Sequence, residues 1–330
     1  HIGMEKSQLN EIIKGKRDFN TELAILLETA LGLEAMYWLN LQSQYNIDLA
    51  RIDQSKSERL VAMTTIEECS SFIAIKYLRK QKVISGDPVS DIPVLSNIYG
   101  IENLGQIQHV FEAAQFARFR KSEKLAVDKV NLVGWVKYSE YVAKSITVKP
   151  FLESAWDSLK EELRTLFHRN ENVHDTAQEI LSEYGIKLLY QQKAEKAPID
   201  GIAFWSGDNP SIAMTLRHKR LDNFAFTLFH ELGHIFLHLK GDKTKEIIDL
   251  ARNDEEFKTS KEELEANEFS RNNLIPADKW SSFKSMGEWY EEDVYEFANE
   301  INIHPSIVLG RLCFELDHYA IKTTIDKAIN

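Results

Sequence analysis

The chain has 330 residues, which is room for about two or three domains. Hydrophobic residues make up 43% of it and charged residues 28%, as in ordinary soluble globular proteins. The formal net charge of −11 excludes non-specific adhesion of the whole protein to DNA, so any contact with nucleic acid must come from a local patch.

No stretch of the sequence approaches the roughly 20 apolar residues that span a bilayer, and the N-terminus lacks the basic and apolar regions of a secretory signal. The two cysteines, Cys69 and Cys313, lie far apart and form no CxxC pair. A disulfide framework is therefore not expected, and the sequence favours a cytoplasmic protein with no membrane partner.

Residues 1–51 are predicted to form short helices. Apolar side chains recur at helical spacing before Gly15, and again between two possible N-caps at Asn20-Thr21 and a stop at Gly32. A third helical segment follows this glycine.

Residues 52–150 are predicted to be a second, helical region in the middle of the chain. Glycine and proline interrupt it at residues 86–93, where we place a linker, and a further break is expected near Pro150.

Residues 151–330 are predicted to form a third region, in which the pattern changes after Tyr184. Strands are predicted at residues 186–190, 202–205 and 212–216, with turn residues at 198–201 and 207–210 between them. Such short connections favour a small antiparallel meander.

Helices are predicted after the strands. One starts with Asp222 as N-cap and covers residues 223–239, and another covers residues 261–274. The polar stretch between them is long for a loop, and residues 246–250 within it are expected to be helical. The expected fold class is therefore α+β, mostly α.

An HExxH motif, His230-Glu231-Leu232-Gly233-His234, lies inside the predicted helix 223–239. Residues four apart share one face of a helix, so the imidazoles of His230 and His234 can reach one tetrahedral Zn²⁺. The metal lowers the pKa of a bound water, and Glu231 can take the proton from that water as general base. The motif predicts a zinc metallopeptidase.

HExxH also occurs in surface helices, where it means only an ordinary glutamate and two histidines. Two features favour zinc here. Apolar residues flank the motif on both sides, and burying two histidines and a glutamate without a partner would cost several kcal/mol. Gly233 costs about 1 kcal/mol in a helix relative to alanine, which indicates close approach of another element at that face.

A third protein ligand is expected from the next predicted helix. Glu263 is preferred because Asn267 lies one turn further on, where it can orient the carboxylate. Two alternatives stay open: Glu263 only caps its helix, since Ser260-x-x-Glu263 is a capping box, or Glu265 is the ligand. His238 does not fit the spacing of the HExxHxxGxxH pattern, so we expect it to pack beside the ligands or support them.

Five stretches of the sequence, all in its second half, together resemble a known protein family. They are Asp200-Gly201-Ile202-Ala203-Phe204-Trp205, the run from Asp222 to His234, Glu263-Leu264-Glu265-Ala266-Asn267-Glu268-Phe269, Leu274-Ile275-Pro276 and Leu309-Gly310-Arg311-Leu312. In this order they resemble the ImmA/IrrE family of metallopeptidases, over roughly residues 150–315. The resemblance implies a minimal zincin fold that cleaves helix-turn-helix repressors. It also implies His230, His234 and Glu263 as the metal ligands and Glu231 as the catalyst.

A second resemblance lies in the stretches from Gly3 to Arg17 and from Leu31 to Gln42. The first is similar to the second half of a lambda-repressor-type helix-turn-helix, and the second is similar to HigA-type antitoxins. Base edges would be read by Ser7, Gln8 and Asn10, and phosphates would be held by Lys6, Lys14, Lys16 and Arg17. The chain begins at about the turn of this motif, so we expect a partial domain: either the chain is a fragment or DNA binding is lost.

The expected function is a zinc-dependent endopeptidase that acts on a regulatory protein, such as a helix-turn-helix repressor or a toxin–antitoxin partner. A substrate segment is expected to add as a strand beside residues 212–216. The same chain is expected to carry a segment for double-stranded DNA, and a homodimer is left open. The alternative is a DNA-binding antitoxin or transcriptional autoregulator whose peptidase-like domain is a sensor or is inactive. His218 and His304 are candidates for stabilising an oxyanion, although single histidines are more often structural.

Overall fold

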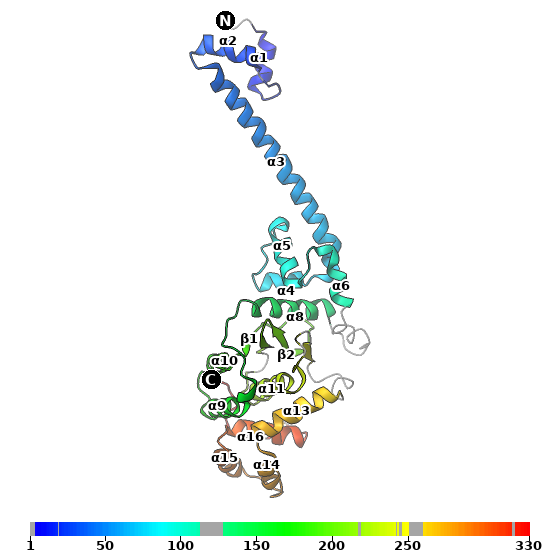
Figure 1. Ribbon diagram of the computed structural model, residues 1–330, viewed down its shortest axis with the longest axis vertical. Helices are drawn as coiled ribbons and strands as arrows, with labels where there is room; N and C mark the ends of the chain where they lie inside the picture. The colour runs from blue at the N-terminus through cyan, green and yellow to red at the C-terminus, as the bar shows by residue number, and fades with distance from the viewer. Residues whose placement is uncertain are drawn as a thin grey trace. The chain divides into compact units, whose positions relative to one another are not determined.

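The computed structural model describes residues 4–18, 20–112, 128–216, 219–241, 243, 246–250, 260–318 and 321–330. The chain divides into two compact units, His1–Glu67 and Glu68–Asn330. The first unit is helical, and the second combines helices with a small sheet (Figure 1). Within the described ranges, none of the helices is both long enough and apolar enough to cross a membrane.

The helices of the first unit are α1 (Lys6–Ile13), α2 (Thr21–Leu31) and most of α3 (Ala35–Cys69). The signals predicted at both ends of α2 are confirmed. The Asn20 side chain accepts a hydrogen bond from the Leu23 N–H (3.1 Å), and Gly32 ends the helix at φ 72°. α3 is a single helix of 35 residues, so the third segment predicted for residues 1–51 continues beyond them.

Short helices open the second unit: they are η1 (Ser70–Phe72), α4 (Ile75–Lys80), α5 (Pro88–Tyr99), η2 (Leu104–Gln106), α6 (Ile107–Glu112) and the longer α8 (Lys129–Ala143). The linker predicted at residues 86–93 is wrong, because α5 begins there. Asp87 caps α5 by accepting from the Ser90 N–H (3.2 Å), and Pro88 takes the first helical position, where no N–H is needed. Pro93 lies inside the same helix.

The next elements are the helices η4 (Glu153–Ala155), α9 (Trp156–Arg169) and α10 (Val173–Glu183), followed by the strands β1 (Lys187–Tyr190), β2 (Ile199–Ser206) and β3 (Asn209–Met214). The rest of the chain forms α11 (Leu221–Gly233), the π-helical turn η5 (His234–His238), β4 (Glu246–Leu250), α13 (Lys261–Leu274), α14 (Ala277–Lys284), α15 (Glu291–Glu300) and α16 (Pro305–Glu315). The predicted fold class, α+β and mostly α, is confirmed.

The four strands form one mixed sheet in the order β1-β3-β2-β4. β2 pairs antiparallel with β3 and β4, but β1 runs parallel to β3. The predicted meander is therefore wrong at β1, because residues 191–198 carry the chain past the end of β3 before β2 begins. Residues 246–250, predicted to be helical, form strand β4 instead. Two consecutive isoleucines in that segment favour a strand, because they are β-branched.

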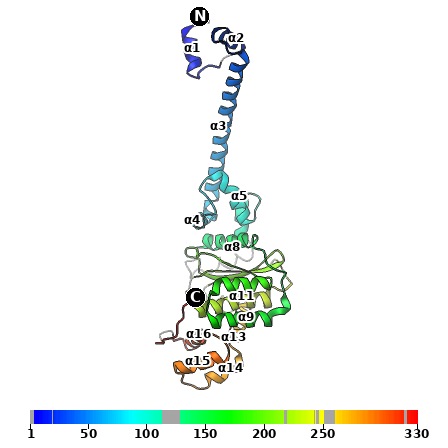
Figure 2. The same cartoon turned by 90° about the vertical axis from the view of Figure 1, so that its left-hand side faces the viewer.

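The sheet lies between α8 on one face and α11 on the other (Figure 1, Figure 2). Every residue of β3 after the first is accordingly buried. One hydrophobic core joins α11 to the sheet, to α9 and α10 and to the C-terminal helices. α11 packs against β2, α13 and α16, which places the HExxH motif between the sheet and α13.

Candidate metal centre

α11 carries the HExxH motif at its C-terminal end, and the last histidine of the motif opens the π-helical turn η5. The predicted N-cap is wrong: α11 is preceded by Arg220, and Asp222 lies buried in the first turn. The Arg220 Nε donates to the Asp222 carboxylate (2.9 Å), and this ion pair compensates the charge of the buried side chain. Of the apolar residues that flank the motif, Phe224, Leu228, Phe229, Ile235 and Phe236 are buried as predicted, whereas Phe226 is half-buried and Leu237 is exposed.

The side chains of His230, His234 and Glu263 converge on one point. The two histidine Nε2 atoms lie 2.9 Å apart. Glu263 Oε2 lies 3.2 Å from His230 Nε2, and Glu263 Oε1 lies 3.5 Å from His234 Nε2. Ligand atoms held about 2.0–2.1 Å from a tetrahedral Zn²⁺ are about 3.3 Å from one another, so these separations fit one ion between the three groups.

These three side chains are 7%, 0% and 8% exposed. Among the described residues, this is the only group of three or more His, Cys, Asp or Glu side chains with ligand atoms within 4.8 Å of one another. Two imidazoles and a carboxylate are also the kind of donor set that zinc takes in proteins. Both the geometry and the chemistry of the residues therefore fit a divalent metal ion.

Glu263 reaches the histidines because α13 crosses α11 at close range. A Cβ on Gly233 would lie 3.2 Å from the Ala266 Cα in α13, so this glycine does mark the close approach that the sequence predicted. Ser260 caps α13 by accepting from the Glu263 N–H (3.3 Å), which leaves the Glu263 carboxylate to face the histidines. Asn267, which was expected to orient that carboxylate, is exposed.

Glu231 is fully buried and lies against the sheet. A Cβ on Gly201 in β2 would lie 2.3 Å from the Glu231 Oε1, so a side chain at position 201 would displace this carboxylate from its present position. The turn predicted at residues 198–201 is wrong, because β2 already begins at Ile199. Sequence reasoning assigned no role at the site to Gly201. A glycine inside a strand, which often marks a close approach, is the signal that could have found it.

Residues 181–325 match the family model of peptidase family M78, the IrrE N-terminal-like domain. The match takes in the sheet, α11, η5, α13 and α16, and covers less than half of the 330-residue chain. It supports the ImmA/IrrE metallopeptidase domain that the resemblance implied. It does not reach residues 1–51, so the helix-turn-helix resemblance stays a prediction. No curated protein matches the chain.

His238 and Glu265 extend the polar site on the other side of His234. His234 Nδ1 lies 3.0 Å from His238 Nδ1, and His238 Nε2 lies 3.0 Å from Glu265 Oε2. Glu265, the alternative to Glu263 as third ligand, therefore bonds to His238 and not to the converging groups. The hydrogen bond from His238 lowers the pKa of the Glu265 carboxyl.

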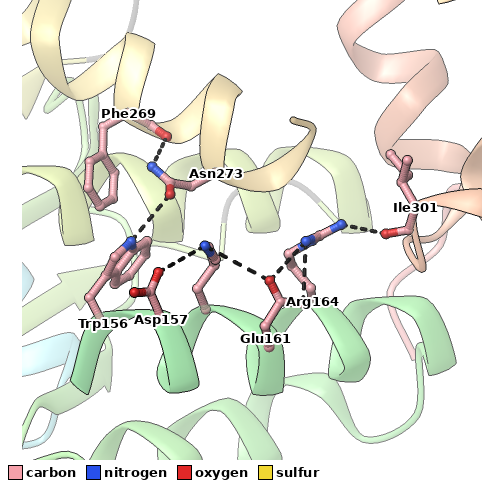
Figure 3. A network of polar contacts seen from close by, with 8 residues as sticks. Trp156, Asp157, Glu161, Arg164, Phe269, Asn273 and Ile301 are labelled. Carbon is pink, nitrogen blue, oxygen red and sulfur yellow. Dashed lines mark hydrogen bonds and ion pairs between the residues drawn. The ribbon is translucent and has the colours of Figure 1, made fainter. Parts of the chain in front are cut away.

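Trp156 in α9 ties together the helices that carry the site (Figure 3). Its indole N–H donates to Asn273 Oδ1 in α13 (3.2 Å), and Asn273 Nδ2 donates to the Phe269 carbonyl (2.8 Å). The Trp156 ring lies 5.8 Å from that of Phe229 and 4.9 Å from that of Phe236, between centroids. These two phenylalanines flank the HExxH motif, so one tryptophan contacts both helices of the metal centre.

The same helix, α9, is anchored to the C-terminal part of the chain. Figure 3 shows Arg164 of α9 donating to Glu161 (3.0 Å) and to the carbonyl of Ile301, which follows α15. Arg164 is 8% exposed. This buried guanidinium links α9 to the segment that follows α15.

His304, one of the two other candidate histidines, has its place at the start of a C-terminal helix. His304 caps α16, where its Nδ1 accepts from the Ser306 N–H (3.2 Å). That contact gives His304 a structural role at a helix start. His218 lies outside the described residues.

The residues predicted to contact DNA lie on α1 and on the segment directly after it. They are Lys6, Ser7, Gln8 and Asn10 on the helix and Lys14, Lys16 and Arg17 beyond it. All are exposed except Gln8, which is half-buried. Acidic side chains stand among them, namely Glu5, Glu11 and Asp18. Their contact with DNA stays a prediction.

Proposed function

We propose that the M78 domain is a zinc-dependent endopeptidase in which His230, His234 and Glu263 hold the metal and Glu231 is the general base. The observation that carries this proposal is the convergence of three buried ligand atoms at 2.9 to 3.5 Å from one another. Catalytic zinc sites take three protein ligands of this kind and keep the fourth position for water or substrate.

Each side chain then has a separate task. A bound Zn²⁺ would polarise the carbonyl of a peptide bond and make a water more acidic. Glu231 accepts the proton of the attacking water and delivers it to the leaving amine. The burial of Glu231 against Gly201 supports this role, because it limits where the carboxylate can lie.

The substrate in this proposal is a regulatory protein of the helix-turn-helix repressor or antitoxin type. The sequence predicted that a substrate strand adds beside residues 212–216, and this prediction is wrong. Both edges of β3 are already occupied, because it pairs with β1 and with β2 over Ile212 to Met214. Among the strands that the structure describes, β1 and β4 are the edges of the sheet. A substrate that adds a strand has to use one of these two.

Metal content tests the first part of the proposal. Zinc is measured per chain in the wild type, in His234→Ala and in His109→Ala, a matched control at an exposed histidine of α6. The wild type and the control should retain about one zinc ion per chain, and His234→Ala should retain far less. Equal metal content in all three proteins would contradict the assigned ligands.

Cleavage tests the second part. Helix-turn-helix repressors and antitoxins are incubated with the zinc-loaded wild type and with Glu231→Gln, each with and without a chelator. Only the wild type without chelator should cleave. Cleavage by both proteins at the same rate would show a contaminating protease or a different catalyst.

DNA binding by residues 1–51 is the second function that we propose, with the M78 domain as its sensor. The exposure of Ser7, Asn10, Lys14 and Lys16 supports it, since these side chains are free to meet a DNA surface. DNA binding that is unchanged by chelator, together with no cleavage of any regulator, would favour this function over proteolysis.

A further inference from the structure

Three side chains form a path that leads outward from the proposed metal centre. His234 turns its Nε2 to His230 and Glu263, and its other nitrogen, Nδ1, lies 3.0 Å from Nδ1 of His238. The second nitrogen of His238, Nε2, lies 3.0 Å from Glu265 Oε2. The side chains of His234, His238 and Glu265 are 0%, 6% and 42% exposed. The buried imidazole of His238 therefore connects a surface carboxylate to His234, one of the proposed metal ligands.

His234 and His238 are the first and last residues of the π-helical turn η5. The Leu239 N–H donates to the carbonyl of His234 (3.0 Å), five residues back and not four as in an α-helix. This wider turn holds the rings of His234 and His238 with centroids 5.2 Å apart, and their Nδ1 atoms face each other. π-Helical turns are rare and are frequently found at functional sites.

We propose that Glu265 and His238 fix the tautomer of His234 in the form that binds metal. An ionised carboxylate only accepts hydrogen bonds, so His238 must carry a hydrogen on Nε2 and donate it to Glu265. The Nδ1 of a neutral His238 is then an acceptor, and the Nδ1 that faces it on His234 must be the donor. His234 thereby keeps the lone pair of its Nε2 for the metal.

This inference rests on the metal site proposed above and makes His238 and Glu265 positioning residues, since neither reaches the metal. Partners that hydrogen-bond to ligating histidines change metal affinity by about 10- to 100-fold. In this chain of hydrogen bonds His234 donates to His238 and His238 donates to Glu265, an order that mere contact between the side chains would not require. An acceptor at position 265 is required, and a donor there would work against the metal.

Reversing the direction of the path is the sharpest test. Glu265→Lys places a donor beside His238 Nε2, so that His238 donates from Nδ1 and the hydrogen of His234 is left on Nε2. The full chain, stripped of metal, is titrated with Zn²⁺ against a chromophoric chelator. Glu265→Lys should bind Zn²⁺ about 10- to 100-fold more weakly than the wild type. Glu268→Lys, which makes the same change of charge at an exposed position of α13, should bind as the wild type does.

His238 is tested with two substitutions of different hydrogen-bonding capacity. His238→Gln offers a donor and an acceptor, and His238→Leu offers neither. The leucine variant should lose affinity, though less than Glu265→Lys because it leaves the tautomer of His234 unfixed, and the glutamine variant should recover most of that loss. Melting temperatures of the metal-free proteins separate weaker binding from poorer folding. Equal affinity for Zn²⁺ in the wild type, Glu265→Lys and His238→Leu would overturn the inference.

The tautomer itself gives a readout that needs no metal. In metal-free protein with isotope-labelled histidine, proton–nitrogen correlation spectra show which ring nitrogen carries the hydrogen. His234 should carry it on Nδ1 in the wild type and on Nε2 in Glu265→Lys. If this pattern is found but Zn²⁺ does not bind, the proposed function fails and the inference holds. If the wild type carries the hydrogen on Nε2, the inference fails even where Zn²⁺ binds.

Discussion

Gly201 in β2 and Glu231 in α11 fit together so closely that a Cβ on the glycine would lie 2.3 Å from the glutamate Oε1 and 2.8 Å from its Cδ. No pair of packed atoms tolerates such distances, so a side chain at position 201 and the present position of the carboxylate exclude each other. The contact involves the carboxylate itself. The sheet therefore limits where the proposed general base can lie.

Gly201→Ala should move Glu231 and slow peptide cleavage, because a displaced carboxylate no longer reaches the attacking water. Loss of general-base catalysis reduces rates by about 100-fold or more. The zinc content should stay at the wild-type value, since the substitution touches none of the three proposed ligands. Cleavage rate, zinc per chain and melting temperature of the purified variant check this expectation.

The double variant Gly201→Ala with Glu231→Gln shows whether the glycine acts through the glutamate. If it does, the effects of the two substitutions will not add, because both remove the same function. A double variant that is slower than Glu231→Gln by the full effect of Gly201→Ala would assign the glycine a separate role.

Sequence patterns predicted the parts of this fold that depend on neighbours along the chain. Asn20 and Gly32 bound α2 as expected, because N-caps and left-handed stops are local chemistry. The four-residue spacing of His230 and His234 likewise brings two imidazoles together within one helix. Gly233 was informative because its cost inside a helix is local too, even though its partner in α13 is not.

The remaining features depend on elements that meet only in the folded protein. The parallel pairing of β1 with β3 follows from the route of residues 191–198, which no periodicity encodes. The contact of Gly201 with Glu231 depends on how β2 lies on α11. The path from His238 to Glu265 depends on how η5 lies beside α13, and the π-helical form of η5 has no established signal in the sequence.

Trp156→Phe should destabilise the unit Glu68–Asn330, because it removes the indole N–H together with part of the aromatic packing. The smaller ring can still contact Phe229 and Phe236, but Asn273 loses the indole N–H that it accepts at 3.2 Å. An unsatisfied, partly buried acceptor should lower the free energy of unfolding by about 1 kcal/mol. Chemical denaturation of the variant measures the change.

Asn273→Ala removes the other partner of the indole–amide hydrogen bond, so the two substitutions can be combined in a double-mutant cycle. If the indole–amide hydrogen bond causes the loss, the variant that combines both substitutions will lose less stability than the sum of the two single losses. Strict additivity would mean that Trp156 stabilises the domain through its ring alone.

His304 should make the protein less stable as the pH falls below neutrality. Burial, with the nearby His168, lowers its pKa from the ordinary value of 6.5. Below about pH 6.5 the unfolded chain therefore binds a proton that the folded protein resists, so the free energy of unfolding falls as the pH falls. The protonated ring also cannot accept from the Ser306 N–H that it caps in the folded state.

His304→Asn retains an acceptor for the cap and removes the titrating group. Denaturation at pH 7, 6 and 5 should therefore show a smaller loss of stability on acidification than in the wild type. His174, whose burial also lowers its pKa, should account for part of the dependence that remains. The same loss in the variant and in the wild type would exclude His304 as a source.

The last prediction concerns DNA and the exposed side chains after α1. If Lys16 and Arg17 hold phosphates, Lys16→Gln with Arg17→Gln will weaken binding to the protein's own promoter and to unrelated DNA alike, because phosphate contacts carry no sequence information. The slope of log affinity against log salt should become shallower by about two. Lys56→Gln, at an exposed position of α3, is the control for loss of one positive charge. Affinity should be measured by fluorescence anisotropy from about 50 to 200 mM salt. An unchanged slope in the double variant would remove these two residues from the DNA surface, and no binding by the wild type would remove the DNA function itself.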